Sequence, residues 1–246
     1  MLSASFAAHL WKALTRQHHR ALLPLLARCV PREGIVLDVG AHAGQYAKLF
    51  ARCAAAGRVY AVEPGAYPRA ILRSVVALHS LGNVTIVPAA LGAIPGEARL
   101  VTPVKRGGAR GFGLAHLGEP EARWRRVVTE SVPQTTIDLL AAELALTRLD
   151  FVKADIEGSE VRMLLGARGS IARFRPRLLI ELNDAHLARN GDTAADAFAL
   201  MAGFGYRGFV LRPDLTLAPA AVPSGAGDFW FFPRGDPLIA GLGETG

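Results

Sequence analysis

Cysteines, aromatic residues and long apolar runs are all scarce in this sequence. Cys29 and Cys53 are the only two cysteines among 246 residues, which excludes a disulfide framework and a cysteine-based metal cluster. Such usage is typical of a reducing compartment, so we expect a cytoplasmic protein. No apolar run is long enough to cross a bilayer. Residues 1–20 also lack the basic start and uninterrupted apolar centre of a signal peptide.

Acidic residues are outnumbered by basic ones, and the formal net charge is +7. This charge permits an anionic partner but does not identify one. The densest basic pieces are residues 123–126 and 173–177, and aromatic residues are not regularly interleaved with them. Because nucleic-acid surfaces commonly combine both features, we expect these pieces to be solvated and nucleic acid to be an unlikely partner.

The first 33 residues predict an N-terminal helical extension. Phe6, Leu10 and Leu14 recur at helical spacing, and Pro24 can open a second short helix. We prefer the interpretation that this extension packs on the main domain. The alternative is weak contact of its helix with a membrane surface, or contact with a partner subunit.

From residue 34 onward the pattern alternates between strands and helices, which predicts an α/β fold with a doubly wound, mostly parallel seven-stranded sheet. This domain should span 34–246 and close with an antiparallel strand pair at 206–212 and 227–232. The expected parallel strands are 35–39, 58–64, 83–91, 149–155 and 177–182, and the expected helices are 43–57, 66–81, 137–146, 159–171 and 194–202.

The region between 97 and 132 is less regular. It contains two further candidate strands, at 97–103 and 125–132. Between them, residues 105–120 are rich in glycine and arginine. We predict a mobile loop near 103–125 that covers the acceptor site.

The motif VLDVGAHAGQYA places Asp38 at the end of a buried strand and a glycine turn behind it. Gly40 and Gly44 let the backbone approach a ligand closely, and the helix start offers free N–H groups. A dinucleotide loop would need the spacing G-x-G-x-x-G, whereas His42 stands here within G-x-x-x-G. The spacing favours a nucleoside cofactor without a pyrophosphate, and the alternative is an ordinary tight turn.

Glu63 follows the second strand, 25 residues after Asp38. In sheets of this kind an acid at that position accepts hydrogen bonds from ribose hydroxyls. Pro64 then ends the strand. Together with the glycine turn, Glu63 makes the nucleoside-cofactor interpretation stronger than either feature alone.

These motifs, together with NVTIVPAALG, TTIDLL, LDFVKADIEGSE and LLIEL, resemble in order and spacing the FkbM-type methyltransferases. That family is similar to class I S-adenosylmethionine-dependent enzymes and mostly methylates sugar or polyketide hydroxyls. The resemblance covers roughly residues 34–183 and implies S-adenosylmethionine as cofactor. It also implies the binding residues: Asp38, Gly40 and Gly44 at the methionine end, Glu63 at the ribose, and Ala89 and Ala90 near the adenine.

Two features depart from the family pattern. His42 stands where the family usually has asparagine; both hydrogen-bond, so we include His42 among the cofactor-binding residues and expect a pH-sensitive contact. The segment 107–120 has no clear counterpart, so the acceptors of the family cannot be transferred through it.

The stretch LDFVKADIEGSE carries three acids within six residues. Asp155 emerges at the carboxyl end of the fourth parallel strand, where ligands of such sheets bind. We predict that it takes the proton of an acceptor hydroxyl or orients that hydroxyl. Glu160 falls in the first turn of the next helix and is interpreted as structural. Glu157 either braces Lys153 or an arginine, or binds an acceptor hydroxyl.

Other polar residues near the fifth strand were weighed as alternatives. His186 is a second candidate base, although a histidine on a helix surface is the preferred interpretation. Asn183 and Asp184 could join Asp155 in a Mg²⁺ site, but nothing demands one and we predict no required metal. The pair His18-His19 and Glu181 are interpreted as unpaired or structural.

The sequence therefore predicts an S-adenosylmethionine-dependent O-methyltransferase acting on a small molecule, sugar or glycan. Asp155, Glu157 and His186 are the candidate catalytic residues. A nucleic-acid methyltransferase and a catalytically inactive cofactor-binding scaffold remain as alternatives, and the intact D-x-E-G block argues against the inactive scaffold.

Overall fold

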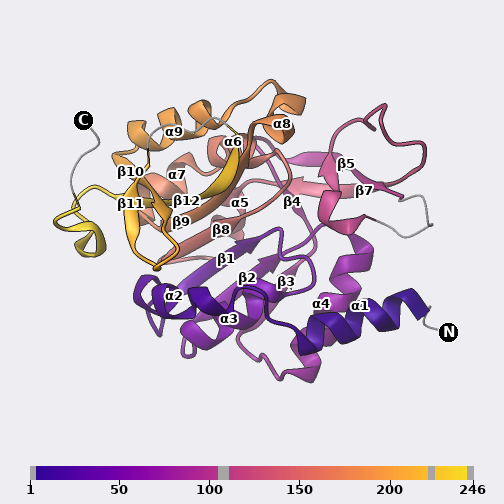
Figure 1. Cartoon of the computed structure of the whole chain (residues 1–246), viewed down its shortest axis with the longest axis horizontal. Coiled ribbons are helices and arrows are strands. Elements are labelled where there is room, and N and C mark those ends of the chain that lie inside the picture. Colours follow the sequence, from indigo (N-terminus) through magenta and orange to yellow (C-terminus); the bar gives the residue numbers. More distant parts are fainter. Residues whose placement is uncertain (1–3, 105–110, 221–224, 243–246) are drawn as a thin grey trace.

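The computed structural model describes residues 4–104, 111–220 and 225–242. Their central feature is an eight-stranded sheet with the order β11-β10-β12-β9-β8-β1-β2-β3 (Figure 1). Five neighbouring strands are parallel: β9 (Arg177–Asn183), β8 (Phe151–Ala154), β1 (Ile35–Val39), β2 (Arg58–Val62) and β3 (Val84–Val87). The predicted α/β fold with a mostly parallel sheet is confirmed.

The closing strand pair is also present, with one addition. β12 (Ala226–Pro233) runs antiparallel between β9 and β10 (Tyr206–Leu211). An eighth strand, β11 (Leu217–Pro219), pairs with β10 at the edge of the sheet. The sequence analysis did not predict it, because three residues are too few to show a strand pattern.

Period-two alternation along the strands divides the core into two layers. In β12, Phe229 and Phe231 join the core on one face of the sheet. Trp230 and Phe232 join the core on the other face. Both faces are therefore apolar, which is typical of a sheet covered by helices on both sides.

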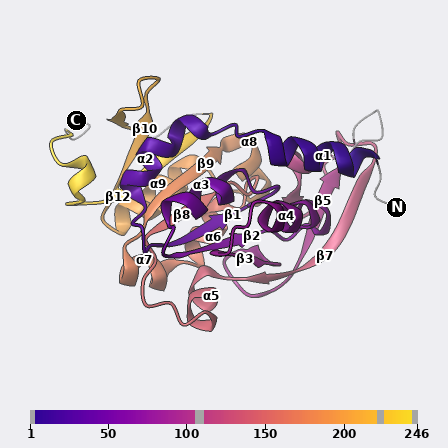
Figure 2. The ribbon, with the colours of Figure 1, turned by 90° about the horizontal axis from the view of Figure 1, so that it is seen from below.

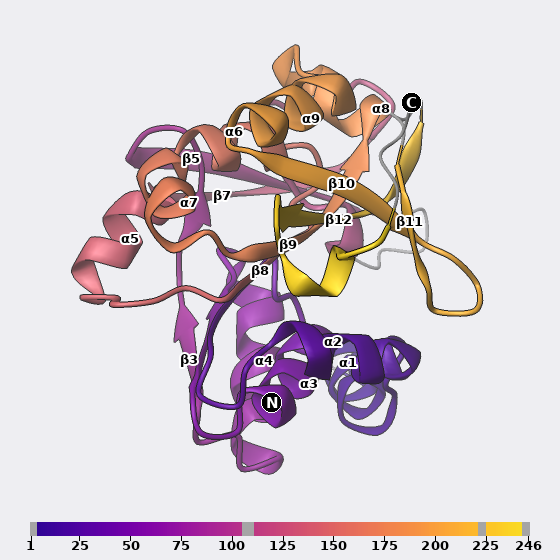
Figure 3. The ribbon, with the colours of Figure 1, turned by 90° about the vertical axis from the view of Figure 1, so that its left-hand side faces the viewer.

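Helices cover each face (Figure 3). One face carries α1 (Ala4–Thr15), α2 (Leu23–Cys29), α3 (Gln45–Cys53) and α4 (Ala66–Leu78). The other carries α5 (Ile137–Glu143), α6 (Glu160–Leu165), α7 (Arg168–Phe174) and α9 (Ala194–Gly203), with α8 (Asp184–Leu187) after β9. None of the helices in the described residues combines the length and the apolar character required to span a bilayer.

The apolar stripe of α1 is covered by the domain. Phe6, Leu10 and Leu14 pack against Ile71 and Val75 of α4, and α1 lies beside α4 in Figure 2. This packing supports the first of the two interpretations of the extension.

Two predicted elements are divided in the structure. Residues 83–91 were expected to form one strand, but Pro88 has no amide to continue the ladder, and the chain leaves β3 to form β4 (Ala90–Leu91). The predicted helix 159–171 is broken into α6 and α7 around Gly166. A Cβ at Gly166 would lie 2.1 Å from the carbonyl oxygen of Gly92, so only glycine permits this close approach.

β4 belongs to a second sheet that the sequence analysis did not foresee. Its strand order is β4-β7-β5-β6, with β7 (Val127–Thr135) and β5 (Gly96–Pro103) antiparallel and β6 (His116–Leu117) at the edge. Residues 105–110 of the predicted mobile loop lie outside the described residues. The later part of that loop contains the short 3-10 helix η2 (Phe112–Leu114) and β6.

Gly40, which follows β1, lies very close to the backbone of Asp155, which follows β8, and a substitution of Gly40 tests this close approach. Its φ is +74°, and a Cβ there would lie 1.9 Å from the backbone oxygen of Asp155. We expect Gly40→Ala to lower the free energy of unfolding by about 1–3 kcal/mol. Chemical denaturation measures this change. Gly82→Ala is the control, because a Cβ at Gly82 would meet no atom within 4 Å. Equal midpoints for the two variants would contradict this close approach.

Candidate active site

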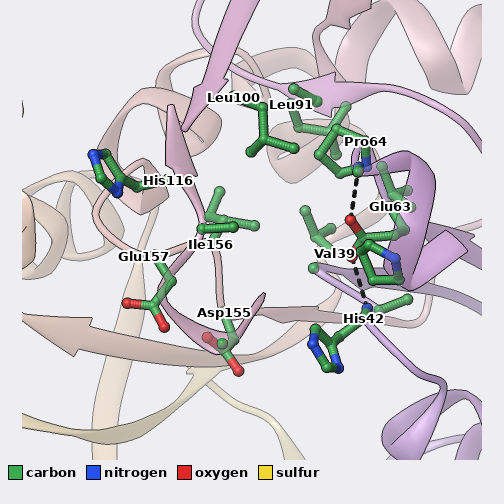
Figure 4. A pocket seen from close by; sticks show the side chains of 18 of the residues that line it. Val39, His42, Glu63, Pro64, Leu91, Leu100, His116, Asp155, Ile156 and Glu157 are labelled. Atoms are coloured by element: carbon green, nitrogen blue, oxygen red, sulfur yellow. Dashed lines mark hydrogen bonds between the residues drawn. The ribbon is translucent and has the colours of Figure 1, made fainter. Parts of the chain in front are cut away.

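A cavity of about 290 Å³ lies at the carboxyl ends of β1, β2 and β8, beneath the second sheet. Its two ends differ in character (Figure 4). Leu91 and Leu100 line one end, and the carboxyl groups of Asp155 and Glu157 lie at the other. The cavity therefore offers an apolar slot that leads to a polar, acidic region.

Glu63 is an acid of the cavity wall that is held by two backbone amides. It is buried, and its Oε2 accepts the backbone N–H of His42 while its Oε1 accepts that of Gly65, both at 2.8 Å. Burial raises the pKa of Glu63 to about 7, although the two backbone N–H groups oppose this shift. A carboxylate oxygen has two lone pairs, so each oxygen retains an acceptor position for a ligand.

The loop after β1 is tightly folded over this acid. The amides of Gly40 and Ala41 both donate to the carbonyl oxygen of Val62. His42 has a φ of +48°, and its ring faces the open cavity (Figure 4). Loss of hydration lowers the pKa of His42.

Two predicted cofactor residues, Asp38 and Gly44, do not line the cavity. Gly44 starts α3 with a φ of +82°, and a Cβ there would lie 2.8 Å from Cδ1 of Leu72. Asp38 is completely buried behind the loop. Both residues therefore lie behind the cavity wall. Ala89 and Ala90 line the apolar end.

Lys153 is buried at the centre of the polar end. Its Nζ lies 3.4 Å from the carbonyl oxygen of Gly40, 3.4 Å from Asp155 and 3.9 Å from Asp38. Burial by itself would lower the pKa of Lys153, but the two carboxylates outweigh it and raise the pKa. The ring of Tyr46 lies 5.0 Å from Nζ and completes the surroundings of this ammonium group.

Strand register explains why these charges meet. Asp38 of β1 is the direct partner of Lys153 on β8, and alternation turns both side chains to the face that carries Tyr46. Two residues beyond Lys153 on the same face, Asp155 follows β8, and Glu181 lies beside it on β9. Asp228 on β12 is the direct partner of Glu181. The register therefore sets three carboxyl groups in one row at the edge of the sheet.

Asp155 and Glu181 share a hydrogen bond and respond to each other. Burial would raise the pKa of Asp155, but the charge of Lys153 and this hydrogen bond hold it below its ordinary value. Burial and the adjacent Asp155 raise the pKa of Glu181 to about 8. Glu181 is therefore the member of the pair that is protonated more readily. Glu181 lines the cavity and is hydrogen-bonded to Asp155, so its interpretation as an unpaired residue is wrong.

Glu157 and His186 form a pair at the edge of the cavity. Their Oε2 and Nδ1 atoms are 2.7 Å apart. Glu157 lines the cavity from a turn with a φ of +55°, whereas His186 lies on α8 and does not line it. Burial, helped by Asp155, raises the pKa of Glu157 to about 7, and burial lowers that of His186. The side chain of Glu157 thus pairs with His186 rather than with Lys153.

Glu160 is structural, as the sequence indicated. Its carboxylate is buried and accepts the backbone N–H groups of Ile156 and Gly158. The Mg²⁺ alternative is not supported. The Asn183 side chain caps α8, and Asp184 accepts the amides of Ala194 and Gly225. No group of acids, histidines and cysteines within the described ranges is arranged to hold a metal ion.

Two further histidines, His19 and His116, also line the cavity. His19 lines the cavity and stacks on Tyr46, with ring centroids 4.4 Å apart. His116 of β6 is buried in the opposite wall, and its ring nitrogens lie 3.2 Å and 3.3 Å from the carbonyl oxygens of Leu114 and Glu119. His116 belongs to the loop near 103–125 that the sequence predicts to cover the acceptor site. His19 was interpreted as unpaired or structural, because it lies outside every recognised motif.

Comparison with known proteins places this chain in a family. The model of the methyltransferase FkbM domain matches residues 38–207. The structure of the methyltransferase FkbM from Methylobacillus flagellatus KT is similar, with a TM-score of 0.51 and 16% identity. The match covers 94% of this chain but only 56% of that one, so this chain spans little more than half of that protein. No curated protein matches.

More distant structures also align. A putative methyltransferase from Streptococcus mutans, in complex with SAH, has 9% identity and a TM-score of 0.49, covering 89% of this chain and 98% of that one. A putative O-methyltransferase from Klebsiella pneumoniae has 13% identity and a TM-score of 0.47, covering 94% and 90%. Scores of this size support no conclusion about the acceptor. The family model does establish the class: this chain belongs to the FkbM methyltransferase domain family, whose members have a class I fold and use S-adenosylmethionine.

Proposed function

We propose that the protein transfers the methyl group of S-adenosylmethionine to a hydroxyl oxygen of a small molecule, sugar or glycan. The observation that carries this proposal is the group of carboxyls at the polar end of the cavity. Asp155 and Glu181 share a proton there, and Glu157 has a pKa of about 7. Carboxylates accept hydrogen bonds from hydroxyl groups, and a carboxyl with a pKa near the working pH is suited to remove their proton.

The residues present fit the cofactor. The apolar slot of Ala89, Ala90 and Leu91 suits the adenine ring. The free lone pairs of Glu63 suit the ribose hydroxyls, and the loop with Gly40 and His42 suits the methionine end. When bound, S-adenosylmethionine supplies an electrophilic methyl group, which leaves the chain to align the acceptor and to receive its proton.

Asp155 and Glu157 have different tasks in this proposal. The charge of Lys153 outweighs the effect of burial and keeps the pKa of Asp155 low. Asp155 is therefore a weak base, but it stays ionised and can accept a hydrogen bond that orients the hydroxyl. Glu157, with its pKa near 7, receives the proton. His186 does not line the cavity, and it acts by holding the Glu157 carboxylate. Of the two roles that the sequence left open for Asp155, this proposal keeps the orienting of the hydroxyl and gives the role of base to Glu157.

A nucleic-acid acceptor is less well supported. The carboxyl groups of Asp155, Glu181 and Asp228 stand in one row at the polar end, and the ionised Asp155 among them would repel a phosphate backbone. Such repulsion does not affect a neutral sugar or another hydroxylated molecule. A cytoplasmic location fits the cysteine usage and is likewise part of this proposal.

The cofactor assignment is tested at Glu63. We expect Glu63→Ala to weaken binding of S-adenosylhomocysteine about ten- to a hundredfold, because charge-assisted hydrogen bonds are lost. Isothermal titration calorimetry measures this change. Glu97→Ala removes an exposed carboxyl of the second sheet and is the control. Unchanged affinity in Glu63→Ala would mean that the ribose is held elsewhere.

The acceptor assignment is tested by methyl transfer from labelled S-adenosylmethionine to a panel of monosaccharides, oligosaccharides and small alcohols, with total RNA as the alternative acceptor. With an accepted hydroxyl compound, Asp155→Asn and Glu157→Gln should each lower turnover about 10²–10⁴-fold while cofactor affinity is largely kept. Transfer to RNA, or near-normal turnover in both variants, would exclude the proposed chemistry.

The shared proton is tested by the pH dependence of stability. The pKa of Glu181 is raised in the folded state, so its stabilising contribution is complete below its unfolded pKa and is lost as pH rises through about 8. Glu181→Gln should therefore lose less thermal stability than the wild type between pH 5 and pH 9. Glu143→Gln, an exposed carboxyl on α5, is the control. Parallel curves for wild type and Glu181→Gln would show that no proton is shared.

A further inference from the structure

The N-terminal extension is attached to the first turn of α3, which is the end of α3 nearest the cavity. Lys48 of α3 donates from its Nζ to the carbonyl oxygens of Ala13 and Arg16, at 2.7 and 2.9 Å. These carbonyls belong to the last turn of α1 and to the residue that follows it, where helical partners run out. The Lys48 ammonium thereby fixes the place at which the chain leaves α1.

The next three residues lie on the part of α3 that forms the cavity wall. Gln17 Nε2 donates to the carbonyl oxygen of Gln45 at 2.8 Å, and the amide of His18 donates to Gln45 Oε1 at 3.3 Å. The ring of His19 is stacked on Tyr46. Gln45, Tyr46 and His19 all line the cavity. The extension therefore holds two wall residues from outside and supplies a third.

His19 belongs to the polar end rather than to the apolar slot. Burial and the charge of Lys153 lower the pKa of His19, while Asp228 and Asp155 act in the opposite sense. The imidazole is thus within the field of the same charges that form the acidic row. Figure 2 shows that the chain between α1 and α2 passes on the side of the sheet that carries α3.

We propose that residues 17–19 form the outer wall of the methyl-transfer end of the cavity, and that cofactor binding and the docking of this segment on α3 stabilise each other. A ligand that orders Gln45 and Tyr46 favours the docked segment, and by linkage the docked segment raises the affinity for the ligand. The family match begins at residue 38, so residues 17–19 lie outside the matched range. The inference rests on the cofactor and not on the hydroxyl acceptor.

Binding of S-adenosylhomocysteine, measured by calorimetry, tests the wall through two matched pairs of variants. Lys48→Met releases the end of α1 without touching the cavity, and Lys12→Met makes the same substitution on the exposed side of α1. His19→Ala removes the wall ring, and His18→Ala removes its exposed neighbour. We expect about three- to tenfold weaker binding for Lys48→Met and His19→Ala. Both controls should stay within about twofold of the wild type.

Trypsin provides a second readout, because Arg16 and Arg20 flank the segment and are exposed. By reciprocity, saturating S-adenosylhomocysteine favours the docked segment and should slow cleavage at these two sites in the wild type. In Lys48→Met this protection should shrink. Should Lys48→Met fail to fold in a melting assay, His19→Ala and the wild-type cleavage rates decide the matter.

Two results would overturn the inference. One is equal affinity for S-adenosylhomocysteine in wild type and His19→Ala. The other is cleavage at Arg16 and Arg20 that does not change when the ligand is added. If cofactor binding fails in every variant and in the wild type, the cofactor assignment itself is wrong, and that outcome is distinct from a failure of the wall.

Discussion

The buried ammonium group of Lys153 is the interaction on which the rest of the site depends. It lies between Asp38 of β1 and Asp155 at the end of β8, and it also contacts the carbonyl oxygen of Gly40. A buried charge without partners is strongly destabilising. Separating β1 from the end of β8 would leave Lys153 without its carboxylate partners, so this charge holds the two elements together. Asp38 illustrates this: burial raises its pKa to about 6, and the charge of Lys153 opposes that shift. Asp38 helps to fix the position of Lys153, and the charge of Lys153 keeps Asp155 ionised.

The same arrangement separates the properties of neighbouring carboxyl groups. Asp155, next to Lys153, has a lowered pKa, whereas Glu157 and Glu181 have pKa values raised to about 7 and about 8. Three acids of similar intrinsic strength thus become one permanent acceptor and two groups that exchange protons near neutral pH. Such divergence is how a site obtains acid and base functions from a single residue type. It agrees with methyl transfer to a hydroxyl, where a proton has to be received and little else has to be stabilised.

The family domain supplies only part of the cavity wall. The strand ends and the glycine loop provide the residues suited to the cofactor, and these lie within residues 38–207. His116 and Leu100 of the second sheet form one further wall, and His19 of the N-terminal extension forms another. His19 lies outside the matched range altogether.

The sequence by itself determined the sheet, its covering helices, and the positions of Glu63, Asp155 and Glu157, because period-two and helical patterns and the spacing of strand ends are local properties. Only the tertiary structure decided which side chains meet. Strand register placed Glu181 beside Asp155, and it buried Asp38 behind Lys153. Packing on Leu72 made Gly44 a structural residue. His19 reached the cavity through contacts with Gln45 and Tyr46, and such contacts between segments distant in the chain leave no periodic trace in the sequence.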